Sequence, residues 1–131
     1  MANSGLSEPA IWSISGHDNS VFVGVTSGHI YRSLNFSQNW GLANSEIDYI
    51  APVGSLCSTG SRLVAGTHGS GLYTSDDLGN TWIRRNSINT VEIRSVYFNG
   101  SHVLAGTDML GIYSSTNNGT SFNQANTGLG S

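Results

Sequence analysis

The stretch Val53–Asn86, VGSLCSTGSRLVAGTHGSGLYTSDDLGNTWIRRN, decides the fold, because the chain carries two more copies of it. The segments Ile11–Asn44 and Ile93–Asn126 align with it without a gap, and the copies begin 42 and 40 residues apart. Identical residues recur at matching positions, among them Gly24/Gly66/Gly106, Tyr31/Tyr73/Tyr113 and Ser33/Ser75/Ser115. Repetition at a fixed period of about 20–50 residues is typical of proteins built from stacked modules. We therefore interpret the chain as three copies of one structural unit.

Each unit contains four short extended runs separated by turn residues. In the second copy we expect strands at Val53–Cys57, Leu63–Thr67, Leu72–Ser75 and Thr81–Arg85. Runs such as Val21–Val23 are apolar on successive residues, which indicates that both faces of the sheet are covered. Apolar residues at helical spacing are not found over a useful length. The pattern predicts an all-β fold, a β-propeller of four-stranded antiparallel blades. The single domain 1–131 would hold three blades, at about 8–44, 50–86 and 91–126.

A turn motif, Ser75–Trp82 (SDDLGNTW), fits the pattern S-x-D-x-G-x-T-W at every fixed position. It resembles the Asp-box, or BNR, repeat of sialidases, related glycoside hydrolases and many non-enzymatic propellers. Weaker copies of the motif occur in the first and third units. The resemblance implies a structural turn between the third and fourth strands, away from the ligand face. We expect the aspartate to accept backbone hydrogen bonds, the glycine to allow the turn, and the tryptophan to pack into the blade. The motif residues are Ser75, Asp77, Gly79, Thr81, Trp82; Ser115, Asn117, Gly119, Phe122; and Ser33, Asn35, Trp40.

We expect no metal and no cofactor. Asp76–Gly79 lacks the alternating acids and the distal glutamate of a calcium loop. The four histidines, His17, His29, His68 and His102, occupy different repeat positions without metal-ligand spacing. Cys57 is the single cysteine, so the chain forms no internal disulfide, and its place on a predicted inner strand favours a core thiol.

Composition argues against several classes of partner. Charged residues make up 10% of the chain, lysine is absent and the net charge is −3. Binding to nucleic acid or to an anionic membrane needs clustered lysine and arginine, so we expect neither. No apolar run approaches the roughly 20 residues of a membrane helix, and no signal peptide is visible. We expect a soluble chain, and the compartment stays open.

An enzymatic role is the main alternative, because the resemblance includes sialidases. It implies three arginines that grip a carboxylate, a tyrosine–glutamate nucleophile pair and an aspartate acid/base, spread over six blades. The arginine motif of that family is not seen, and of the five arginines only Arg94 falls in a first strand. Glu8, Glu46, Asp48 and Glu92 fall between blades, but no motif pairs them. We therefore favour a non-catalytic protein without catalytic residues, with part of a sialidase-type glycoside hydrolase as the alternative.

A binding surface is expected where the repeats differ most. Identity is lost in the turns Thr26–His29, His68–Gly71 and Asp108–Gly111 and in the connections between blades. Loops that vary on a repeated scaffold often carry function, although loops without function vary in the same way. Trp12 and Arg94 share one repeat position, where an aromatic ring and a guanidinium would suit a sugar or a carboxylate. The candidate face comprises Trp12, His29, Glu46, Asp48, His68, Glu92, Arg94, Asp108 and Met109.

Three blades do not close a ring, since propellers typically have four to eight. The N-terminal Ala2–Leu6 (ANSGL) echoes Ala125–Leu129 (ANTGL), so a second copy placed head to tail would continue the repeat. We expect a homodimer that forms a six-bladed ring with two-fold symmetry through an obligate interface above ~2,000 Å². The favoured function is a binding or scaffold propeller that presents its loops to a protein or glycan. Two further alternatives are a piece of a longer propeller and a designed repeat protein without a ligand.

Overall fold

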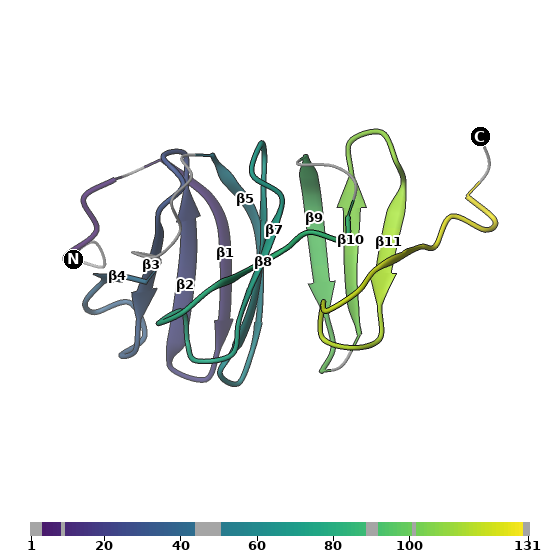
Figure 1. Cartoon of the computed structure of the whole chain (residues 1–131). Coiled ribbons are helices and arrows are strands. Elements are labelled where there is room, and N and C mark those ends of the chain that lie inside the picture. Colours follow the sequence, from purple (N-terminus) through teal and green to yellow (C-terminus); the bar gives the residue numbers. More distant parts are fainter. Residues whose placement is uncertain (1–3, 9, 44–50, 89–91, 101, 130–131) are drawn as a thin grey trace.

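A computed structural model describes residues 4–8, 10–43, 51–88, 92–100 and 102–129. Within these ranges the chain forms strands and no helix (Figure 1). The strands pair into three four-stranded antiparallel sheets, each of which follows the chain order from its first strand to its fourth. The predicted all-β class is confirmed. The strands are β1 (Ile11–His17), β2 (Ser20–Val25), β3 (Ile30–Ser33), β4 (Gly41–Leu42), β5 (Val53–Thr59), β6 (Arg62–Thr67), β7 (Leu72–Ser75), β8 (Ile83–Arg85), β9 (Ile93–Phe98), β10 (Val103–Thr107), β11 (Ile112–Ser115) and β12 (Asn123–Gln124).

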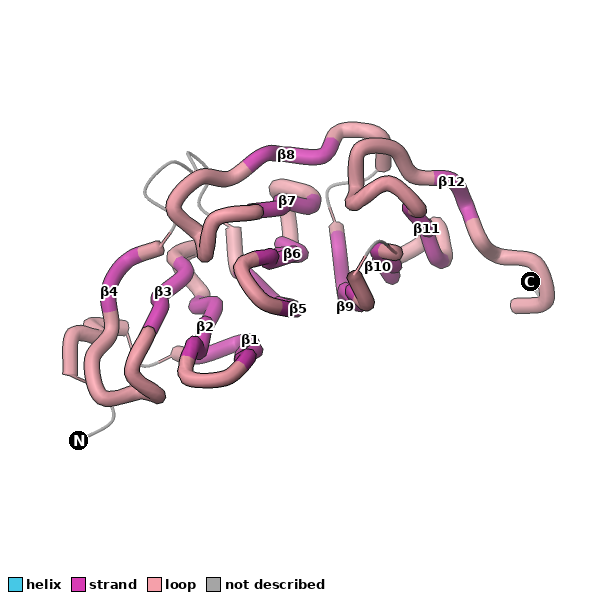
Figure 2. The backbone as a smooth tube through the Cα atoms, turned by 90° about the horizontal axis from the view of Figure 1, so that it is seen from below, coloured by secondary structure: helices cyan, strands magenta, loops and turns pink. Residues whose placement is uncertain are grey.

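The sheets stack side by side along an arc. Figure 2 shows the first strands β1, β5 and β9 on one side of the arc and the fourth strands β4, β8 and β12 on the other. The middle sheet lies between its two neighbours, so both of its faces are covered. The two layers between the sheets are apolar: one is centred on Phe22, Val53 and Leu63, and the other on Val64, Ile93 and Val103. Burial of these side chains is the main contribution to the stability of the arc.

Glycines in the second strands let adjacent sheets approach closely. A Cβ atom built on Gly24 would lie 2.6 Å from Val53 Cγ1, and one built on Gly66 would lie 2.6 Å from Ile93 Cγ2. Val53 and Ile93 occupy the same repeat position at the start of β5 and β9. Each sheet therefore receives a branched aliphatic side chain of the next sheet in the space that a glycine leaves open.

The turns between third and fourth strands have one geometry in all three sheets. Ser75 Oγ donates to Asp77 Oδ1 at 2.9 Å and accepts from the Gly79 amide at 2.9 Å. Asp77 Oδ1 also accepts from the Thr81 amide at 2.8 Å. The same bonds recur with Ser33 and Asn35 in the first sheet and with Ser115 and Asn117 in the third. In each sheet the polar atoms of the turn are therefore largely satisfied within the turn itself.

The tryptophan of the second turn reaches the preceding sheet. Trp82 Nε1 donates to the carbonyl of Ala43 at 2.7 Å and to that of Gly79 at 3.0 Å. The Leu78 amide donates to the Ser61 carbonyl at 2.8 Å, which places the turn beside the β5–β6 hairpin. We call this end of the sheets the turn end, and the opposite end, with the β2–β3, β6–β7 and β10–β11 connections, the loop end.

Candidate binding face

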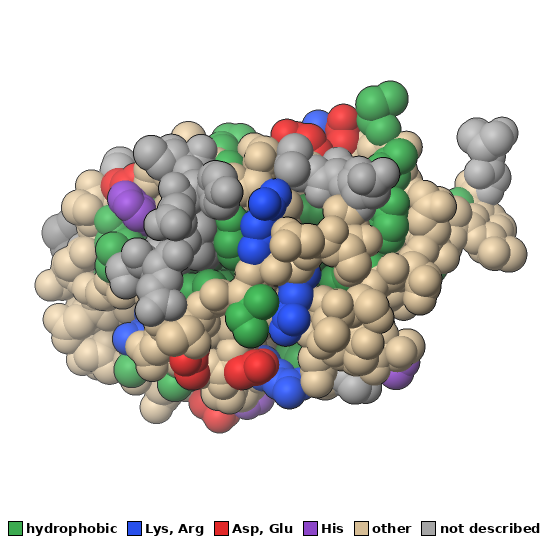
Figure 3. Space-filling model, viewed as in Figure 1, with side chains coloured by type: hydrophobic (Ala, Val, Ile, Leu, Met, Phe, Trp, Pro, Cys, Tyr) green, Lys and Arg blue, Asp and Glu red, His purple; other side chains and the backbone are tan. Residues whose placement is uncertain are grey.

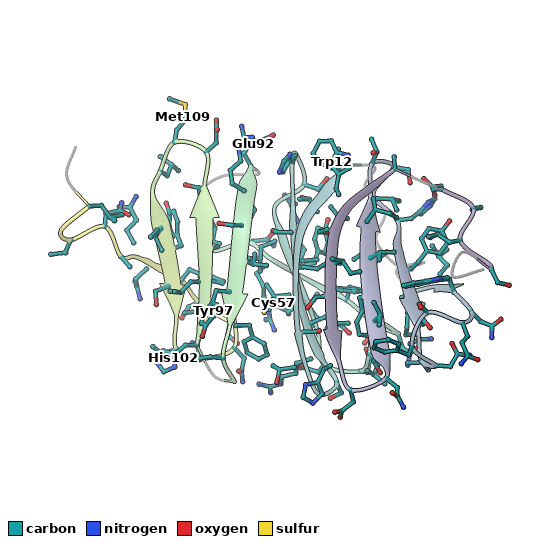
Figure 4. All side chains as sticks on the ribbon, turned by 180° about the vertical axis from the view of Figure 1, so that it is seen from behind. Trp12, Cys57, Glu92, Tyr97, His102 and Met109 are labelled. Atoms are coloured by element: carbon teal, nitrogen blue, oxygen red, sulfur yellow. The ribbon has the colours of Figure 1, made fainter. Side chains whose placement is uncertain are left out.

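Most of the sequence-predicted site residues that the structure describes lie at the loop end. Figure 4 shows Trp12, Glu92 and Met109 along this edge, while Tyr97 and His102 lie toward the turn end. The alternation of hairpins explains the grouping, because first strands begin and second strands finish at the same edge. Three different sheets thus contribute side chains to one face.

Trp12 and His68 form an aromatic pair across the first two sheets. Their ring centroids are 5.2 Å apart with an interplanar angle of 74°, an edge-to-face arrangement. Gly54 makes room for it, because a Cβ atom at this position would lie 2.4 Å from His68 Nε2. Trp12 nevertheless keeps 48% of its surface exposed. The contact with His68 therefore orients the Trp12 indole while about half of its surface stays accessible to a ligand.

Arg94 and Asp108 form an exposed ion pair on the third sheet. Arg94 Nη2 and Nε lie 2.7 and 3.1 Å from the same carboxylate oxygen, Asp108 Oδ1. The Asp108 amide donates to the Glu92 carbonyl at 3.4 Å, and Glu92 forms an isolated β-bridge with His68. Because the pair is solvent-exposed, it adds little to stability. The ion pair holds the Arg94 guanidinium and the Asp108 carboxylate in defined positions at the surface.

A second polar group surrounds Glu8 on the first sheet. Glu8 Oε1 contacts His29 Nδ1 and accepts from the Tyr31 hydroxyl at 3.2 Å, and Ser27 Oγ lies 3.0 Å from His29 Nδ1. Hydrogen bonds from Ser27 and His29, with a smaller one from Tyr31, lower the pKa of Glu8 below its usual range. His29 belongs to the face predicted from the sequence, whereas Glu8 does not, because its only signal is that it is an acid before the first strand.

The remaining predicted residues are not part of these pairs. Met109 projects from the tip of the β10–β11 connection (Figure 4) and is almost fully exposed. Glu46 and Asp48 lie outside the described residues. Figure 3 shows tan side chains and backbone over much of this side of the molecule, with acidic, basic and apolar groups next to one another at the visible part of the loop end. The loop end therefore combines local aromatic, ionic and apolar features.

In the part of the chain that the structure describes, no three His, Cys, Asp or Glu side chains are grouped to hold a metal ion. No helix long and apolar enough to cross a bilayer occurs in the same ranges.

Comparison with solved structures decides the fold. YCF48 bound to D1 peptide superposes with a TM-score of 0.79 at 13% identity, over 92% of this chain and 42% of that one. The fold is that of β-propeller blades. The GH74 xyloglucanase from Xanthomonas campestris gives a TM-score of 0.74 at 16% identity, over 94% of this chain and 25% of that one. The computationally designed Ika8 protein gives 0.71 at 14% identity, over 86% and 35%.

These likenesses show the architecture of the three blades and no more, because every identity is low. The chain spans 42% or less of each of these three propellers. No protein-family model and no curated protein sequence matches the chain.

Proposed function

We propose that the chain is an arc of a non-catalytic β-propeller that binds a protein or glycan at its loop end. The observation that carries the proposal is the convergence of Trp12, His68, Arg94 and Asp108 from three blades on one exposed edge. A half-exposed indole suits the apolar face of a sugar ring or an apolar peptide side chain. The neighbouring guanidinium suits a carboxylate, which both peptides and acidic glycans carry.

The residues of the turn end have a structural role, which supports placing the ligand at the loop end. We assign the three turns between third and fourth strands to the Asp-box, since Ser75, Asp77 and Gly79 and their counterparts make the same bonds in every blade. Their polar atoms are engaged within the turn, and the aspartate carboxylate bonds to Thr81. Ligand contacts are therefore assigned to the opposite edge, the loop end.

A hydrolytic function is the second candidate, because glycoside hydrolases of the GH74 class share the fold. A glycoside hydrolase needs a carboxylic acid whose pKa is raised so that it can donate a proton. Hydrogen bonds lower the pKa of Glu8 and of Asp77 instead, and Asp108 is paired with Arg94. None of these three carboxyl groups is therefore suited to act as the proton donor. The structural neighbour YCF48 is bound to a peptide, which supports a protein as the ligand.

The test is a binding screen against a glycan array and a library of peptides with free carboxyl termini. We expect binding in at least one class, and Trp12→Ala and Arg94→Ala should each weaken it by about tenfold or more. Phe36→Ala, an exposed aromatic at the turn end, is the matched control and should leave affinity unchanged. Binding that is insensitive to Trp12 and Arg94 would contradict the assignment of the face.

The same preparations separate the two candidate functions. A panel of fluorogenic glycosides should give no turnover above the buffer rate. Turnover that is lost in Glu92→Gln or Arg94→Ala would replace the binding function with the hydrolytic one.

A further inference from the structure

On the open side of the third blade, Leu104 and Ile112 are less buried than their counterparts in the other two blades. Leu104 is 37% exposed, whereas Val64 at the same repeat position is 2% exposed. Tyr97 is exposed as well, and Ile112 is half-buried. Between these residues lies an open hollow of about 340 Å³, lined by Ser95, Val96, Tyr97, Leu104, Gly106 and Ile112. We call this surface the trailing flank. It contains no charged side chain, so it suits an apolar occupant.

The opposite side of the first blade also exposes apolar residues whose counterparts in the second blade are buried. Ile11 is 40% exposed, whereas Val53, its counterpart in the second blade, is 1% exposed. Ile14 is also exposed, although its counterpart Leu56 is buried. We call the surface formed by Ile11 and Ile14 the leading flank. Its outer part is covered by the chain itself, because Leu6 packs against the cluster of Val23, Val25 and Tyr31.

The two contacts within the chain define what these flanks can receive. Val53 fills the space beside Gly24, and Ser13 Oγ donates to the Val53 carbonyl at 2.7 Å. Ile93 fills the space beside Gly66. At Gly106, the third member of this set, a Cβ atom would meet only atoms of Ser95. The space beside Gly106 therefore lacks the branched side chain that its two counterparts receive.

We propose that Ile11 of a second copy of this chain fills the space beside Gly106, so that the leading flank of one copy docks on the trailing flank of another. Ile11 belongs to the same repeat position as Val53 and Ile93, and it has the required branched shape. Two such contacts close a ring of two copies with two-fold symmetry. The inference rests on the packing of the blades and is independent of what the loop end binds.

The first test is the mass of the 131-residue chain in solution, measured by light scattering over a wide concentration range. We expect about twice 13.8 kDa. Ile11→Arg and Leu104→Arg should each weaken association by at least about 100-fold, since each places an unpaired charge in an apolar contact. Both residues are exposed in the single copy, so the variants should retain the far-ultraviolet circular dichroism of the parent. Ile83→Arg, on the exposed outer strand β8, is the matched control and should remain dimeric.

Mixing the two variants tests the direction of docking. A mixed pair contains one contact with both substitutions and one contact with neither, so Ile11→Arg and Leu104→Arg chains should associate together more strongly than either does alone. A self-paired contact of two trailing flanks would leave Ile11→Arg fully dimeric, which would overturn the proposal. A mass of 13.8 kDa at every concentration would overturn it too, and would assign both flanks to other blades. Growth beyond two copies would overturn the closed ring.

Discussion

At the scale of single residues, the turns between third and fourth strands show which side chains the repeat tolerates. Asp77 in the second blade corresponds to Asn35 in the first and Asn117 in the third, and all three accept a hydrogen bond from the amide four residues later. Asp77 also accepts from the Thr81 hydroxyl, whereas Asn117 Nδ2 donates to Ser121 Oγ. The turn therefore requires one side-chain oxygen that accepts a hydrogen bond at this position. The negative charge of Asp77 is not needed for that bond.

The charge of Asp77 makes the stability of the second turn depend on pH. Hydrogen bonds from the Thr81 hydroxyl and amide, and a smaller one from Ser75, lower the pKa of Asp77. A lowered pKa stabilises the fold above the unfolded value of about 3.9, and this stability is lost as pH falls through the folded value. We expect Asp77→Asn to reduce the acid sensitivity of thermal unfolding below about pH 4. Asp77→Ala should cost about 1 kcal/mol at neutral pH.

Thermal melts between about pH 2 and pH 7 measure both effects. Asp76→Asn is the control, since Asp76 is the exposed neighbour that pairs with Arg62. If Asp77→Asn and Asp76→Asn shift the acid limb equally, the hydrogen bonds from Thr81 and Ser75 to Asp77 are not its cause.

The sequence predicted only part of the backbone of this turn. Gly79 was expected to need a conformation that favours glycine, and its φ of 85° agrees. Leu78 before it, with a φ of 60°, was not expected, because no glycine marks that position. The first blade adds a second departure, with Ser37 at a φ of 68° where the other blades have glycine. Hydrogen bonds from the turn amides to Ser33 and Asn35 hold a conformation there that residue type alone does not predict.

At the scale of strands, the repeat predicted the order and nearly all the positions. In the second blade the first strand was expected to end at Cys57 and extends to Thr59, and the fourth strand was expected at Thr81–Arg85 and is observed at Ile83–Arg85. The Thr81 amide is bonded to Asp77 and the Trp82 indole to the preceding blade, so neither residue is a ladder partner of β7. The contact of Trp82 with Ala43 joins two units, and a pattern read within one unit does not reveal it.

The spacing of adjacent strands gives an element-scale prediction at Gly66. Its φ is not in the left-handed region, so alanine is disfavoured by close approach alone, of Ser55 Oγ at 2.5 Å in the same sheet and of Ile93 in the next sheet. The added methyl group would lie 2.6 Å from Ile93 Cγ2 and 3.1 Å from Ile93 Cβ, which would force β9 away from β6. We expect Gly66→Ala to destabilise the chain by about 1–3 kcal/mol.

Denaturant unfolding measures this cost. Gly41→Ala is the matched control, because a Cβ atom on Gly41 meets nothing within 4 Å. It should leave stability within about 0.5 kcal/mol of the parent. Equal losses for both substitutions would mean that replacing a strand glycine by alanine, and not the spacing of β6 from the next blade, sets the penalty.

At the scale of the whole molecule, the variable turns located the candidate face, but its pairings came from the stacking of blades. Nothing in the sequence joins Trp12 to His68, because their contact depends on the room left by Gly54 and on the distance between two sheets. Arg94 and Asp108 are brought together by the register of β9 and β10. Position within a repeat predicts which edge a side chain occupies, whereas its partner on the neighbouring blade is a property of the assembled arc.

The arc also predicts an uneven distribution of stability. The second blade is covered on both faces, and β6 is buried along almost its whole length, whereas β10 exposes Leu104 to solvent. Amide exchange is slowest where opening must expose the most packed surface. In dilute solution we therefore expect hydrogen exchange to be slower in β6 than in β10 at matched positions, by about tenfold or more. Because docking of a second copy would cover the trailing flank, raising the concentration should slow exchange in β10 and leave β6 almost unchanged. Leu104→Arg removes that dependence if docking is its cause, and equal protection of β6 and β10 in the monomer would contradict the arrangement of covered and open faces.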